Sequence, residues 1–158
     1  MLTKRAFMGI GAAVLGVGVG GYFWLSEPEP SHSYFAVDGV ALRGADPVAY
    51  FTQSDAVIGT PEHAYDWSGV TWHFASQEHL ELFKAAPEAY APQFGGYCAW
   101  AVAAKQRLFS IQPQNWAVVD GKLYLNFSDR VEETWNTDRF GFIKKGIEVW
   151  PDVRKQLL

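Results

Sequence analysis

The sequence has little with which to make covalent or soft-metal cross-links. Cys98 is the only cysteine in 158 residues, so no internal disulfide can form. Both methionines, Met1 and Met8, lie near the start, which leaves the rest of the chain without a thioether for a methionine-rich copper(I) site. The stability of the fold must therefore come from packing.

Basic charge and nucleotide motifs are also scarce. The chain has 13 basic and 17 acidic residues, and it shows no basic stripe of the kind that follows a phosphate backbone. It contains no glycine-rich phosphate loop and no H-E-x-x-H motif. These observations argue against nucleic-acid binding and against the commonest nucleotide- and zinc-dependent enzymes.

Aromatic side chains are what the sequence has in abundance. Apolar residues make up 49% of the chain and aromatic residues 16%, with seven Trp and eleven Phe. This composition predicts a folded domain with a substantial core and argues against disorder. The length allows one such domain plus an appendage.

The appendage is an apolar leader over residues 1–25. Lys4 and Arg5 precede a run of about twenty apolar residues, long enough to span a bilayer core of about 30 Å. Residues 3–8 resemble a twin-arginine export motif with Lys in place of the first Arg. Tyr22-Phe23-Trp24 follows instead of a small-residue cleavage site. We expect a signal peptide or signal-anchor, retained as a transmembrane helix, then a linker over residues 26–34 and a body on the periplasmic face of a bacterial inner membrane.

The body, residues 35–158, carries local signals for an α+β fold with short antiparallel hairpins and several helices. Turn signals predict three hairpins, at Asp38-Gly39, Ser68-Gly69 and Asp120-Gly121. Ser76, Ser128 and Asp138 are placed to cap helices, as is Asp46 with Pro47 after it. We expect the helix after Asp138 to end at about Val149, before Pro151.

Four segments of the body resemble one known family. They are Asp46-Pro47-Val48-Ala49-Tyr50-Phe51, Phe74-Ala75-Ser76, Gly95-Gly96-Tyr97-Cys98-Ala99 and the run from Val119 to Asn126. From about Phe35 to Pro151 the chain resembles the YHS domain, which is related to the cysteine-rich, metal-binding TRASH-type fold. The resemblance implies a small YHS/TRASH-like domain after an N-terminal apolar helix.

The chain departs from that family at the metal ligands. Metal-binding relatives have cysteines in the patterns D-P-V-C and F-C-S-x-x-C. In this chain the three cysteine positions hold Ala49, Ala75 and His79. The thiolate site that the resemblance would imply is therefore missing.

The remaining candidate metal ligands are Cys98, His79 and His73. His73 lies on a predicted strand and His79 in the first turn after Ser76. Cys98 is expected in the first turn of its own helix, where backbone N–H groups favour a thiolate. If the turns converge, these side chains make a set suited to a copper or zinc ion. Each also has a simpler interpretation: Cys98 as a small buried residue, His79 on an exposed helix face, and His73 as a solvent-facing or hydrogen-bonded strand residue.

Two functional hypotheses follow. The first is a non-enzymatic, envelope-located binding module that takes a transition metal such as copper through Cys98 and histidine. The alternative is a metal-free structural or partner-binding domain that kept the fold and lost the site. A cysteine-dependent enzyme is less favoured, since no oxyanion loop is recognisable. The sequence also allows one or two of its tryptophans to line a pocket for a small molecule or a partner's segment.

The leader generates a first prediction. The full-length protein should fractionate with the membrane and keep its leader, because the apolar run can span and no cleavage site follows it. Membrane fractionation followed by N-terminal sequencing measures this. A soluble mature form that begins after Leu25 would contradict the anchor and leave export standing.

Overall fold

The computed structural model describes residues 33–158. The predicted signal-anchor, residues 1–25, and nearly all of the linker lie outside the described residues. Within residues 33–158, no helix combines the length and the apolar character needed to cross a membrane.

The main sheet has four strands in the order β1-β2-β4-β3. Strand β1 pairs with β2, and β3 with β4, in the antiparallel sense, as the hairpin signals predict. Strand β2 also pairs with β4 in parallel, through Val40 and Thr71, which joins two hairpins into one mixed sheet. The strands are β1 (Ala36–Val37), β2 (Val40–Ala41), β3 (Thr60–Trp67) and β4 (Val70–Phe74), and a separate hairpin is made of β5 (Trp116–Val119) and β6 (Lys122–Leu125).

All three predicted turns join adjacent strands. Asp38 and Asp120 have φ of 51° and 50°, and the glycines after them have φ of 79° and 71°. Two successive left-handed residues make the type of tight turn whose twist matches that of the flanking strands. The hairpins therefore follow from local sequence.

Three of the predicted caps open helices. The Ser76 Oγ accepts from the backbone N–H of His79 at 3.2 Å, and the Ser128 Oγ accepts in the same way at 3.3 Å. Asp138 accepts from the N–H of Gly141 at 3.0 Å. They begin α2 (Gln77–Ala85), α5 (Asp129–Asn136) and α6 (Arg139–Val153). The shorter elements are α1 (Ala49–Thr52), α3 (Pro87–Tyr90), α4 (Ala99–Lys105) and the 3-10 turns η1 (Leu42–Gly44), η2 (Gln93–Gly96) and η3 (Arg154–Leu157).

The predicted end of the last long helix is wrong. Helix α6 does not stop at about Val149 but runs through Pro151 to Val153. Val149 and Val153 lie one turn apart on the same face and are both buried. A proline in the last turn removes one backbone hydrogen bond, and this packing outweighs that loss.

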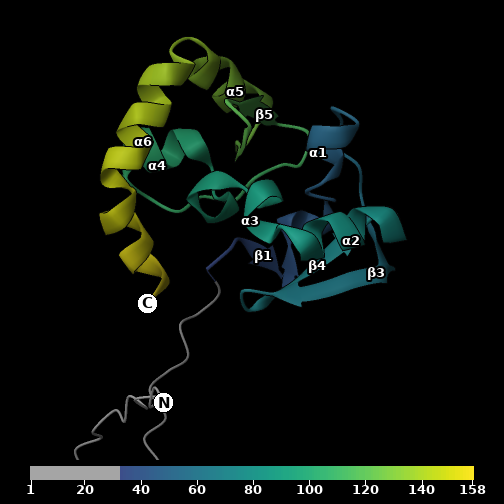
Figure 1. The fold of residues 1–158 in the computed structure, drawn as a ribbon. Coiled ribbons are helices and arrows are strands. Elements are labelled where there is room, and N and C mark those ends of the chain that lie inside the picture. Colours follow the sequence, from purple (N-terminus) through teal and green to yellow (C-terminus); the bar gives the residue numbers. More distant parts are fainter. Residues whose placement is uncertain (1–32) are drawn as a thin grey trace, which may run out of the picture.

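Two clusters of buried side chains form the core. In the first, Trp72 and Phe74 of β4 contact Phe83 of α2, with ring centroids 5.0 and 5.2 Å from it. The second lies among α4, α5, α6 and the β5–β6 hairpin, and includes Trp135 and Val149. Figure 1 shows α6 alongside α4 on one side of the body and α2 over the four-stranded sheet on the other. The fold class is therefore α+β, as predicted.

Phe83 provides a test of the first cluster. Phe83→Ala should lower the free energy of unfolding by about 3–5 kcal/mol, because this ring is 0% exposed and four aromatic rings surround it. Phe140→Ala, at a 69% exposed position of α6, is the matched control and should change it by no more than about 0.5 kcal/mol. Urea unfolding of both variants measures the difference, and equal effects would contradict this description of the core.

Candidate functional site

The most densely hydrogen-bonded polar group of the described chain is the carboxylate of Asp46, which is 0% exposed. Its Oδ1 accepts from the backbone N–H groups of Val48 at 2.8 Å and Ala49 at 3.3 Å. Its Oδ2 accepts from the N–H of Ala75 at 2.8 Å and from the Nδ1 of His79 at 2.6 Å. A buried charge is costly unless it is hydrogen-bonded, and here four donors compensate it.

His79 is held at both ring nitrogens. Its Nδ1 donates to Asp46, and its Nε2 lies 3.2 Å from the Thr52 Oγ1. The side chain comes from the first turn of α2 and the residue is only 7% exposed. The simpler interpretation that put His79 on an exposed helix face is therefore wrong: Asp46 draws the ring inward.

The role predicted for Asp46 as a helix cap is confirmed in part. It caps a turn whose N–H groups belong to Val48 and Ala49, but the helix that follows begins at Ala49 and not at Pro47. Capping uses only Oδ1. The other oxygen, Oδ2, makes the contacts with Ala75 and His79 that the sequence did not reveal.

Tyr50, next to this network, is a structural group. Its hydroxyl donates to the carbonyl of Pro113 at 2.8 Å. Burial, together with the nearby Asp46 and Asp55 carboxylates, raises the pKa of Tyr50 well above its usual range. The phenol therefore stays protonated and keeps its hydrogen bond.

The order Asp46–His79–Thr52 is that of the carboxylate, base and hydroxyl of many hydrolases. Such chemistry also needs a bound substrate beside the hydroxyl. Thr52 has a second partner, since its Oγ1 lies 3.1 Å from the carbonyl of Val48. Neither of the two pockets that the described residues form most clearly is lined by any member of the trio. The geometry therefore supports a structural role for Asp46, His79 and Thr52, in which their hydrogen bonds hold α1 and α2 in position.

Cys98 lies elsewhere. It is 0% exposed, stands just before α4, and its Sγ donates to the Oδ1 of Asn126 at 3.7 Å. Burial raises the pKa of the Cys98 thiol, although nearby N–H groups of Ala101, Phe127 and Trp100 act in the opposite direction. The N–H groups at the helix start favour the thiolate, as expected, but burial outweighs them. The simpler interpretation of Cys98 as a small buried residue is confirmed.

The neighbours of His73 differ from those of His79 and of Cys98. On β4 it alternates with Trp72 and Phe74, which are fully buried, while His73 itself is half-buried on the other face. There it lines a shallow pocket together with Gly44 and Ile58. The three predicted ligands thus have different partners. Within residues 33–158, no group of three or more His, Cys, Asp or Glu side chains is placed to hold a metal ion.

Comparisons with protein-family models, with curated proteins and with solved structures found no match.

Asp46→Asn tests the network. The amide nitrogen of Asn cannot accept the hydrogen bonds that one carboxylate oxygen receives, so we expect the free energy of unfolding to fall by about 2–5 kcal/mol. Asp55→Asn is the matched control, since Asp55 is exposed and accepts only a local bond from Ala56; it should change by no more than about 0.5 kcal/mol. Urea unfolding at neutral pH compares them. An unchanged Asp46→Asn variant would mean that the network contributes nothing to stability.

Proposed function

We propose that this protein is a non-enzymatic, envelope-located binding module with a YHS-like fold that holds together without a metal. One observation carries the proposal. The three positions at which metal-binding relatives have cysteines, Ala49, Ala75 and His79, all donate hydrogen bonds to the carboxylate of Asp46.

Because all three positions donate to the same carboxylate, they lie around one point in the structure. Ala49 and Ala75 offer it no side-chain ligand, only backbone N–H groups. His79 offers an imidazole whose Nδ1 is bound to Asp46 and whose Nε2 lies against Thr52. In this proposal, hydrogen bonds to Asp46 join the segments that an ion would join in a metal-binding YHS domain.

The donor groups fit a copper or zinc ion poorly. To bind through Nε2, His79 would have to displace the Thr52 hydroxyl. Cys98 would have to leave its fully buried site beside Asn126, and its raised pKa opposes the thiolate that a metal requires. The metal-binding alternative, through Cys98, His79 and His73, is thus the weaker proposal.

The proposed location in the cell envelope rests on the leader. A helix over residues 1–25 would tether the body to the inner membrane with the body on the periplasmic side. In this proposal the body presents a surface or pocket to a small molecule or to a protein partner.

A metal assay decides between the two proposals. Full-length protein in mild detergent should contain no stoichiometric copper or zinc, and its thermal unfolding should not shift when a chelator is added, because hydrogen bonds hold the segments around Asp46. Elemental analysis and a melting curve with and without chelator measure this. His79→Ala should unfold at a lower temperature even in metal-free buffer, while His73→Ala is the control and should melt close to the wild type.

The opposite pattern would favour the metal site. Stoichiometric copper or zinc in the wild type, lost in both Cys98→Ser and His79→Ala, would overturn the metal-free proposal.

A further inference from the structure

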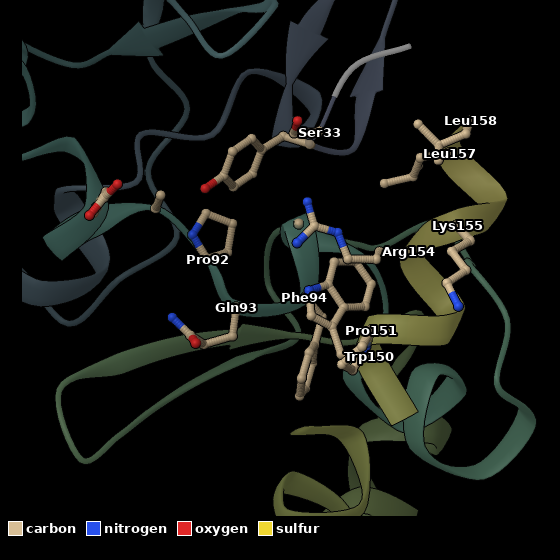
Figure 2. Close-up of a pocket in the computed structure, with 14 residues that line it drawn as sticks. Ser33, Pro92, Gln93, Phe94, Trp150, Pro151, Arg154, Lys155, Leu157 and Leu158 are labelled. Carbon is tan, nitrogen blue, oxygen red and sulfur yellow. The ribbon is translucent and has the colours of Figure 1, made fainter. Parts of the chain in front are cut away.

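A pocket of about 600 Å³ lies where the N-terminal end of the described chain meets η2 and the end of α6 (Figure 2). This volume is in the range of small-molecule sites. The pocket lies between the two core clusters, as its lining shows: Tyr34 packs against the first cluster, and Phe94 and Trp150 belong to the second. One of the tryptophans that the sequence allowed for a pocket, Trp150, is therefore in one, whereas Trp72 and Trp135 are fully buried in the core.

The backbone around this pocket is fixed. Phe35 donates its N–H to the carbonyl of Gly95 at 2.7 Å, which holds the N-terminal segment on η2. Gly95 has φ of 59°, and a Cβ there would lie 2.6 Å from the Ser33 carbonyl oxygen and 3.5 Å from the Trp150 ring. Only glycine allows the backbone of η2 to come this close to Ser33, so the N-terminal segment and η2 are in direct contact at this wall of the pocket.

Apolar rings and one free cation give the pocket its chemistry. The Phe94 and Trp150 rings lie 5.7 Å apart between centroids. The side chain of Arg154 makes no hydrogen bond or ion pair in the described part of the chain, and only its backbone N–H is bonded, to carbonyls of the preceding turn. Lys155, by contrast, pairs with Asp152 at 2.6 Å. Figure 2 shows the Arg154 side chain reaching from the end of the helix toward the wall that carries Pro92, near the Phe94 and Trp150 rings.

We infer that this pocket binds a small organic carboxylate with an aromatic or other apolar body. Its carboxylate lies on the guanidinium of Arg154 and its body on the rings of Phe94 and Trp150. The inference rests on the proposed function, because it gives that binding module a class of ligand.

The charges of the lining select this class. A guanidinium matches a carboxylate with two parallel hydrogen bonds, and its flat face also tolerates a neighbouring ring. A neutral apolar ligand would use the rings and leave Arg154 without an anion. Glu88 also lines the pocket and repels a second negative charge, so a monoanion fits better than a phosphate dianion. Tyr34 and Gln93 supply further polar groups at the wall.

Calorimetric titration of the full-length protein in mild detergent tests the inference, with a chelator present throughout. The probes are 3-phenylpropionate, its neutral analogue 3-phenylpropanol, and propionate, which lacks the ring. We expect 3-phenylpropionate to bind with a Kd on the order of 0.1 mM and each of the other two to bind at least about tenfold more weakly.

Variants locate the contact. Arg154→Gln should weaken binding of 3-phenylpropionate by about tenfold or more and leave 3-phenylpropanol unchanged. Arg130→Gln, at an exposed arginine of α5 outside the pocket, is the matched control and should bind like the wild type. Trp150→Leu should weaken the acid and the alcohol alike, since both use the ring.

Two results would overturn the inference. If Arg154→Gln binds the acid as well as the wild type does, the carboxylate does not lie on Arg154. If the wild type binds no probe at the solubility limit, the pocket does not take this class of ligand. Neither result bears on the metal-free fold, which the melting curve with chelator tests by itself.

Discussion

The buried carboxylate of Asp46 is the constraint on which the first half of the body depends. It lies between the start of α1, the end of β4 and the first turn of α2, and it accepts hydrogen bonds from all three. Unpaired, such a charge would disfavour folding strongly. Paired with four donors, it fixes the relative positions of segments that lie about thirty residues apart in sequence, which neighbouring apolar contacts alone would not specify.

Much of this fold could be predicted because its signals are local. The turns at Asp38-Gly39 and Asp120-Gly121, and the caps at Ser76 and Ser128, need only a few neighbouring residues, and the structure contains all four. A single sequence carries that information directly, since turn chemistry and capping act within one or two turns of the backbone.

What the sequence could not reveal depends on distant partners. The contact between Asp46 and His79 and the parallel pairing of β2 with β4 both join separate segments. Helix α6 continues past Pro151 because Val149 and Val153 pack into the core. For Cys98, the sequence indicated both the field of a helix start and burial but not which of the two is stronger, and burial decides its pKa. Thr52, which completes the hydrogen bonds of His79, carried no local signal.

Three of the four donors to Asp46 use the backbone: Val48, Ala49 and Ala75 donate from their N–H groups, whereas His79 donates from its side chain. Backbone donors survive a change of side chain, so a substitution at one of these three residues that preserves the local packing leaves its hydrogen bond to Asp46 in place. Only Asp46 and His79 are fixed by their chemistry. The hydrogen bonds around Asp46 therefore depend on two side chains and on the backbone path of three further residues, Val48, Ala49 and Ala75.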